Sequence, residues 1–201
     1  MESKSKRLSL DEQIDIARNQ LVRARIFLDL WWHYRGSPTR GQSLEAMNEF
    51  SEFFKFDEHA HLTSFIVHIT TLFDKRNDTV KLENLRKTIL QTFAVSDEIK
   101  KELEKHFQQA NGIAAKVLIL RHNAFAHRSA EYNYNDAFTL AKLSYDELLT
   151  LTEKSKQILN QFLKVTQRGE VVFWDLPRKD LAKMLEKLKP PTPILNDLFS
   201  S

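Results

Sequence analysis

Cysteine is missing from the 201-residue chain, which excludes disulfides, cysteine metal ligands and cysteine nucleophiles. Glycine and proline are scarce, at four and five residues, and this favours long regular elements over a loop-rich fold. No apolar run approaches the ~18 residues that a membrane span needs. The N-terminus is charged and lacks the apolar stretch of a secretory signal. We therefore expect a cytoplasmic protein without a membrane partner.

A large excess of one charge sign is also missing, because 30 basic residues face 27 acidic ones and the net charge is +3. A protein that coats duplex nucleic acid normally carries a larger basic excess, whereas a small basic cleft for one RNA loop fits this balance. Hydrophobic residues make up 42% of the chain, enough for a proper core. Leu, Lys, Glu, Ala and Gln dominate, so we expect mostly helix.

Two capping boxes, Ser9 to Glu12 and Ser144 to Glu147, predict long helices that end near residues 35 and 167. The first helix carries an apolar seam typical of a helical bundle, formed by Ile14, Ala17, Leu21, Ala24, Leu28 and Trp31. Further helices are predicted over 43–54, over 57–74 with Asp57 as its cap, over 81–93, and onward from Ser96. Asn111 and Gly112 mark the point where that last helix would bend or break.

The chain divides into three parts by these signals: residues 1–8 as a disordered N-terminus, 9–168 as a helical domain, and 169–201 as a C-terminal appendage and tail. Glu170 to Asp175 is the one strand-like run, and Pro177 suits the first turn of a short last helix. The capping boxes and long apolar seams all precede residue 169, so we expect the appendage to be separable from the bundle.

One stretch, Val117 to Ser129, combines core character with clustered polar groups. Residues 113–120 are apolar on all sides apart from Lys116, a pattern typical of a buried helix. Arg121, His122 and Asn123 then follow together. Burying such groups costs several kcal/mol unless each is paired or faces a wet cleft. Either they form a site, or the cations bind main-chain carbonyls at the end of the helix, where positive charge is favoured.

Helical geometry separates Arg121 from His127 by roughly 120° around the helix axis, since they are six positions apart. One helix cannot aim both side chains at one atom unless it ends or bends between them. A second copy of the helix, related by a two-fold axis, would complete such a site. We therefore expect a homodimer.

Arg121 and His122 followed by four residues and His127 resemble the Arg-polar-x(4–6)-His signature of the HEPN superfamily. The stretches 72–85, 21–31 and 143–149 are similar to its abortive-infection, AbiU-like branch, and the resemblance covers roughly residues 10–166. It implies an all-α, usually dimeric domain, here an HEPN-like helical bundle with a short C-terminal appendage. It also implies, in many members, a metal-independent endoribonuclease without a cofactor. Other members are non-catalytic interaction or scaffold modules, and this remains the alternative.

The residue types suit RNA cleavage at a metal-free site. Arg121 is the candidate phosphate ligand, because its guanidinium is always charged and planar. His127 is the candidate general base for the 2′-hydroxyl, and the product would be a 2′,3′-cyclic phosphate. His122 is the candidate acid for the leaving 5′-oxygen, or it orients its neighbours. Asn123 either fixes the tautomer of His127 or donates to the phosphate.

Three nearby residues are candidates for substrate binding. Arg128 follows the histidine directly, and Tyr132 and Tyr134 could stack on a flipped base or simply cover the core. Some HEPN toxins carry a tyrosine two residues after the histidine, which a partner nucleotidyltransferase modifies. Ser129 stands there in this chain, so regulation at that position is not expected. An antitoxin or activating partner remains an open expectation.

A metal site would need the other clustered histidines, His59, His61 and His68. His61 and His68 share a helix face, but seven positions separate them by ~10 Å along the axis, too far for one ion. His59 and His61 point apart. We expect no metal site here and interpret these histidines as a solvated or interface stripe.

Overall fold

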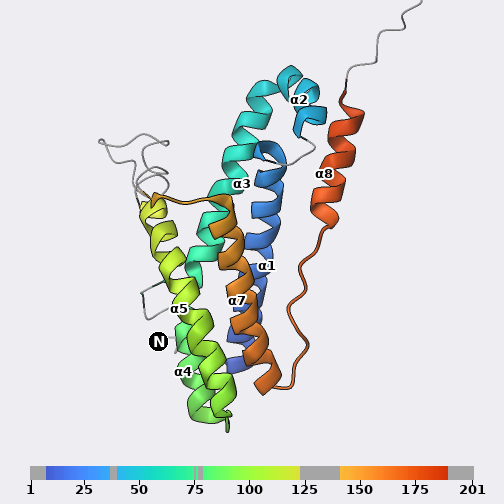
Figure 1. Cartoon of the computed structure of the whole chain (residues 1–201). Helices are drawn as coiled ribbons and strands as arrows, with labels where there is room; N and C mark the ends of the chain where they lie inside the picture. The colour runs from blue at the N-terminus through green and yellow to red at the C-terminus, as the bar shows by residue number, and fades with distance from the viewer. Residues whose placement is uncertain (1–7, 37–39, 75, 77–78, 123–140, 190–201) are drawn as a thin grey trace, which may run out of the picture.

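A computed structural model describes residues 8–36, 40–74, 76, 79–122 and 141–189. The described residues form seven helices and no strand: α1 (Leu10–Arg35), α2 (Arg40–Glu49), α3 (Ser51–Thr71), α4 (Leu82–Thr92), α5 (Asp97–Leu120), α7 (Tyr145–Val165) and α8 (Leu176–Lys187). The long helices α1, α3, α5 and α7 run lengthwise as an elongated bundle, and α8 lies beside its upper part (Figure 1). The predicted all-α bundle is confirmed.

The predicted helix starts are confirmed where a side chain caps them. The hydroxyl of Ser9 accepts from the Glu12 N–H at 3.2 Å, and the Glu12 carboxylate accepts from the Ser9 N–H at 2.7 Å. Ser144 and Glu147 repeat the exchange at 3.2 and 3.0 Å at the start of α7. Each box satisfies two main-chain donors that a helix leaves unpaired at its first turn.

The main core lies between α1 and its neighbours. Trp31 is half-buried, whereas the rest of the predicted α1 seam is fully buried, as are the α3 residues Leu62, Phe65, Ile66 and Ile69. Because α1 packs along both α3 and α7, and α5 packs along α7, one continuous apolar layer runs through the bundle. This burial of apolar surface is the main force that orders the helices.

Asp57 does not cap a helix, and the prediction of a helix start there is wrong. It lies inside α3, which already begins at Ser51. Its carboxylate accepts the Tyr34 hydroxyl proton at 2.6 Å and lies 3.2 Å from Nε2 of His61. A carboxylate serves equally well as a cap or as a long-range acceptor, so the residue type alone did not distinguish the two.

Helix α5 is continuous through Asn111 and Gly112, so the helix does not break there. A Cβ atom at Gly112 would meet nothing within 4 Å, and glycine is therefore not required by space. Glycine in a helix interior costs about 1 kcal/mol relative to alanine. The buried residues on either side, Phe107, Ala110, Ala114 and Val117, outweigh that cost.

The strap, defined as residues 169–175, is extended but pairs with no strand in the described structure, so the strand-like run does not become a strand. Val171 is 2% exposed, and its N–H donates to Oδ1 of Asn160 at 2.8 Å. The ring of Phe173 lies between Arg25 and Lys156, whose cationic groups are each 4.9 Å from its centroid. The strap thus packs against α1 and α7.

Helix α8 follows the strap and begins with proline in its first turn, as predicted. Its Leu181 and Leu185 are buried against Tyr34, Ala46 and Phe54 in a second, smaller core. The second core joins α8 to α1, α2 and α3.

Of the histidines expected to form a solvated or interface stripe, His59 is exposed, whereas His61 and His68 are half-buried. His61 and His68 lie against Phe27 of α1, with ring centroids 5.8 and 5.5 Å away. Nδ1 of His68 also contacts Oε1 of Gln20. Within the described ranges, no group of three His, Asp or Glu side chains is placed to hold a metal ion. Among the described helices, none has the combination of length and hydropathy that a membrane span requires.

Candidate functional site

The end of α5 places the first two residues of the polar cluster. Arg121 keeps helical backbone angles, and its N–H donates to the carbonyls of Val117 and Leu118. At Arg121 and His122 the helix widens into a π-helical turn. Such turns are rare and frequently mark functional sites. The side chain of Arg121 is half-buried, whereas His122 is exposed, so the two residues face different surroundings.

The guanidinium of Arg121 is anchored on α3. Its Nη1 donates to Oγ1 of Thr70 at 3.2 Å, and Thr70 is itself 1% exposed. Thr70 in turn donates its hydroxyl proton to the carbonyl of Ile66 at 2.6 Å. That bond directs a lone pair of the hydroxyl to Arg121. A guanidinium has five N–H donors, and Thr70 takes one of them.

Asp74, at the end of α3, is a titratable group whose charge interacts with that of Arg121. Its pKa is lowered first by the N–H of Arg76, which donates to the carboxylate at 3.0 Å, and also by the guanidinium groups of Arg76 and Arg121. The carboxylate therefore stays ionised at neutral pH. Asp74 pairs with Arg76 at 3.2 Å, and its negative charge also interacts with the positive charge of Arg121.

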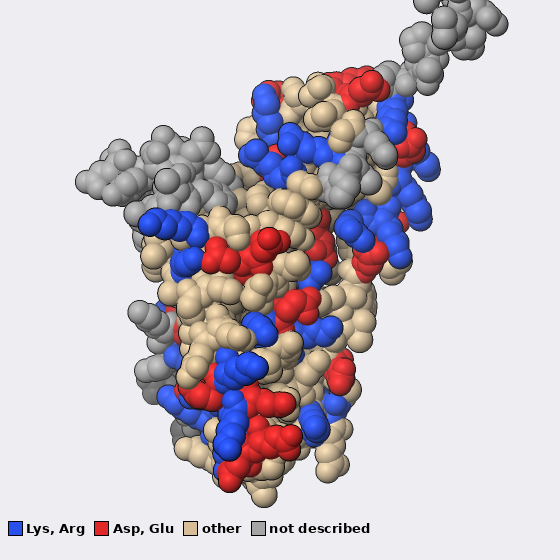
Figure 2. Space-filling model, viewed as in Figure 1, with Lys and Arg blue, Asp and Glu red and all other residues tan. Residues whose placement is uncertain are grey.

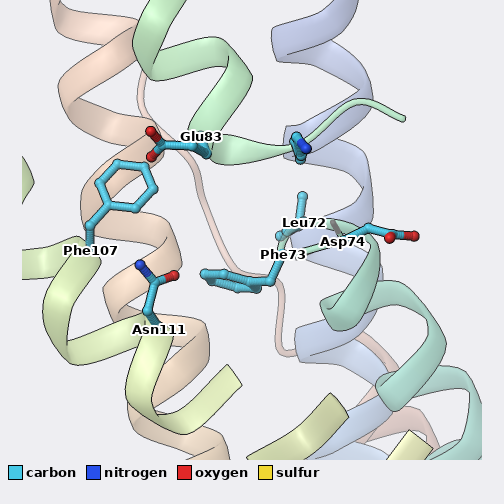
Figure 3. Close-up of a pocket in the computed structure, with 7 residues that line it drawn as sticks. Leu72, Phe73, Asp74, Glu83, Phe107 and Asn111 are labelled. Atoms are coloured by element: carbon cyan, nitrogen blue, oxygen red, sulfur yellow. The ribbon is translucent and has the colours of Figure 1, made fainter. Parts of the chain in front are cut away.

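A hollow of about 310 Å³ lies between the end of α3, the start of α4 and α5 (Figure 3). In Figure 3 Phe73 and Asn111 approach each other, Glu83 and Phe107 lie on one side, and Asp74 points away from them. The full lining is Leu72, Phe73, Asp74, Lys81, Glu83, Phe107 and Asn111. Asp74 thus belongs both to the rim of this hollow and to the surroundings of Arg121.

The outer face of the last turns of α5 carries exposed apolar residues, although residues 113–120 were expected to be buried on all sides. Ala115 is exposed, and Ile119 is 42% exposed. Gly112, Ala115 and Ile119 recur at helical spacing, on the side opposite the buried residues Ala110, Ala114 and Val117. The helix end therefore carries an apolar strip directed away from its own core.

Two of the predicted site residues, Arg121 and His122, lie at the end of α5. Asn123, His127, Arg128, Tyr132 and Tyr134 lie outside the described residues, as does Ser129. Sequence reasoning missed Thr70 and Asp74. Thr70 offered one signal, because it is a lone hydroxyl among the apolar residues Ile66 and Ile69 on the buried side of α3.

Comparison with models of protein families places the chain in a known family. A profile of the HEPN family described as AbiU2 matches residues 8–185, from just before α1 to within α8, and so includes the strap. No curated protein and no solved structure shows a significant match to the chain.

Proposed function

Since the chain belongs to the AbiU2 family of HEPN domains, we propose that it is a metal-independent endoribonuclease of abortive-infection type that acts as a homodimer. The observation that carries the proposal is the anchoring of Arg121 by Thr70. Within the described part of the chain the acceptor is a side-chain hydroxyl, not one of the carbonyls that a helix-capping arginine would bind. A half-buried, oriented guanidinium suits a phosphate ligand.

The reaction follows from the groups at the motif. His127 takes the proton of a 2′-hydroxyl, and the resulting oxygen attacks the adjacent phosphorus. The bond from phosphorus to the 5′-oxygen breaks, and that oxygen takes a proton from His122 as it leaves. Arg121 stabilises the negative charge on the phosphate oxygens during attack. The products are a 2′,3′-cyclic phosphate and a 5′-hydroxyl end, and no metal ion is needed.

The other motif residues have supporting roles in the proposal. Asn123 holds the tautomer of His127 or donates to the phosphate. Arg128, Tyr132 and Tyr134 contact the flanking RNA. The hollow beside Asp74 offers space next to the phosphate site for a neighbouring nucleotide. An antitoxin or an activating partner would act by covering or completing this surface.

The homodimer is proposed for two reasons. On one continuous helix Arg121 and His127 would point roughly 120° apart, and a second protomer would then bring both groups to one phosphate. The exposed strip of Gly112, Ala115 and Ile119 supplies an apolar surface next to the motif. Two such strips facing each other would bury that surface and place both motifs at one interface.

The activity is tested by measuring RNA cleavage and melting temperature on the unmodified chain, on His127→Ala and on Arg121→Ala. The unmodified chain should cut single-stranded or loop RNA in EDTA. His127→Ala should lose about 10²–10⁴-fold in rate because the general base is removed. Arg121→Ala should also lose cleavage, and both variants should stay dimeric. The alternative, a non-catalytic dimeric scaffold, predicts no cleavage by any of the three, with stability lowered by about 1–3 kcal/mol through a lost hydrogen bond.

Mixing the two inactive variants tests whether the site is shared between protomers. If Arg121 of one protomer works with His127 of the other, a mixed dimer contains one intact site. After refolding together, half of the dimers are mixed, and about a quarter of the original activity should return. If both groups act within one protomer, mixing restores nothing.

A further inference from the structure

A second hollow of about 510 Å³ is lined by residues of α1 and of the strap. The strap runs along the side of the bundle away from α5 (Figure 1). Its α1 side is lined by Arg18, Asn19, Val22 and Arg23, and its strap side by Glu170, Val172 and Trp174. We call it the strap groove. Two guanidinium groups face one carboxylate there, so the lining is net positive.

Trp174 is the unusual residue of the strap groove, because its large apolar side chain is 61% exposed. The extended strap alternates its side chains. Val171 and Phe173 pack on the bundle, whereas Val172 and Trp174 face outward. An exposed tryptophan beside arginines is a feature of ligand surfaces rather than of cores.

The strap also holds Trp174 in place from both sides. Before it, Phe173 lies between the cations of Arg25 and Lys156. After it, the carboxylate of Asp175 accepts from Arg178 at 2.7 Å and pairs with Lys179 at 3.3 Å. The indole is therefore presented by an anchored backbone, and a planar ligand would lose little affinity to ordering the protein.

The charged groups around Trp174 indicate the ligand. Arg18 is paired with Asp15 at 2.9 Å, which orients its guanidinium, whereas Arg23 is exposed and has no carboxylate within ion-pair distance in the described part of the chain. Beyond the groove the strap leads into α8, over which Lys and Arg side chains predominate, while the lower bundle mixes both signs (Figure 2). Arginines recognise phosphates, and an exposed indole stacks on unpaired bases.

We propose that the strap groove binds one or two nucleotides of single-stranded RNA, with Trp174 stacked on a base and Arg18 and Arg23 on flanking phosphates. This rests on the proposed function only in taking RNA as the ligand, because binding there requires no cleavage. The groove would hold the substrate strand at a distance from Arg121, which explains how a chain with a net charge of only +3 retains RNA.

The test is fluorescence anisotropy with a labelled oligouridylate of about twelve nucleotides, on the full chain carrying His127→Ala so that the RNA stays intact. Trp174→Ala in that background should weaken binding roughly five- to hundred-fold, because one base loses its stacking partner. Arg18→Gln with Arg23→Gln should weaken binding and reduce the salt dependence by about 1.4 in log–log slope, as expected for two lost phosphate contacts on a single strand.

Lys101→Gln is the control, since it removes one positive charge at an exposed position of α5 outside the groove. It should leave the affinity nearly unchanged. The side chains altered in the groove are surface groups, so circular dichroism should show folded variants. A duplex of the same sequence should compete poorly, because its bases are already stacked and paired.

Unchanged affinity of Trp174→Ala and of the double arginine variant would overturn the proposal, as would displacement of the RNA by polyglutamate as effective as by unlabelled oligouridylate. Failure of the proposed function looks different. If the chain binds RNA through Trp174 but cuts none, the strap groove is supported and the ribonuclease is refuted. If the chain cuts RNA but the groove variants bind RNA as tightly as their parent, the ribonuclease is supported and the strap groove is refuted.

Discussion

Nη1 of Arg121 lies 3.2 Å from Oγ1 of Thr70, a hydroxyl 51 positions earlier in the sequence. This bond joins the end of α5 to the buried side of α3. It orients the guanidinium of Arg121, which the sequence already indicated as the phosphate ligand. The hydroxyl of Thr70 is neutral, so this hydrogen bond orients the guanidinium without neutralising its charge.

Thr70→Val should therefore lower RNA cleavage while the dimer remains intact. The substitution keeps the shape of the side chain but removes the acceptor of Arg121. A hydrogen bond to a charged group contributes about 1.5–3 kcal/mol, so a loss of roughly ten- to hundred-fold in cleavage rate is expected. Thr70→Ser restores the hydroxyl and should recover most of the rate.

Thr71→Val is the matched control for this prediction. The hydroxyl of Thr71 donates to the carbonyl of Val67 at 2.9 Å, whereas the described hydrogen bond of Arg121 goes to Thr70. Its cleavage rate should stay close to that of the unmodified protein. Equal rates for Thr70→Val and Thr71→Val would show that the Arg121 anchor is not used in the reaction.

Ile119→Glu should convert the dimer to a monomer. Ile119 is 42% exposed on the outer strip of α5, and a carboxylate there would place like charges opposite each other across a two-fold interface. Sedimentation velocity at micromolar concentration measures the change. Leu90→Glu, at a 38% exposed position of α4, is the control and should stay dimeric. A parent chain that is itself monomeric would contradict the dimer.

Val171→Ala should destabilise the fold by about 1–3 kcal/mol, because it leaves a cavity at the point where the strap enters the main core. The neighbouring Val172 is 63% exposed, and Val172→Ala should change stability by less than about 0.5 kcal/mol. Urea unfolding of both variants separates the two positions. An effect of Val171→Ala as small as that of Val172→Ala would mean that the strap does not contribute to folding and that the chain after residue 168 behaves as a separate appendage.

Acidification should destabilise the protein partly through His33. Burial, followed by the charge of Arg178, lowers the pKa of this histidine below its ordinary value of 6.5. The unfolded chain then binds more protons than the folded one, so stability is full above pH 6.5 and falls as the pH drops towards the folded pKa. His33→Gln should lose less stability than the parent between about pH 7.5 and about pH 5.

The pKa values of His68 and His106 are lowered in the same direction, by burial first and then by the charges of Arg23 and Lys154. His33→Gln should for this reason remove part of the acid sensitivity and leave the remainder. Chemical unfolding at several pH values gives the slope for each protein. Identical slopes with and without His33 would exclude it as a contributor.

The features that sequence predicted well are those governed by local chemistry. Ser9 with Glu12, and Ser144 with Glu147, exchange hydrogen bonds three residues apart, and that spacing is visible in the sequence. The α1 seam is a property of one helix and was equally visible. These local signals were sufficient to predict an all-α bundle.

The features that sequence missed depend on contacts between residues that are far apart in the chain. Asp57 accepts from Tyr34, 23 positions away, so its carboxylate was mistaken for a cap. Gly112 stays helical because its neighbours are buried by α7 and the rest of the core. Thr70 became a site residue only because α5 ends beside it. Glu170 to Asp175 has strand-like residues but no described strand to pair with.

The chemistry of the RNA ends produced in EDTA tests the central claim most directly. Mass spectrometry of the fragments from the unmodified chain should find 2′,3′-cyclic phosphates opposite 5′-hydroxyl ends, and His127→Ala should yield at least 10²-fold less of both. Fragments ending in 3′-hydroxyl groups, or equal residual cleavage by the parent and His127→Ala, would contradict a metal-independent ribonuclease built on Arg121 and His127.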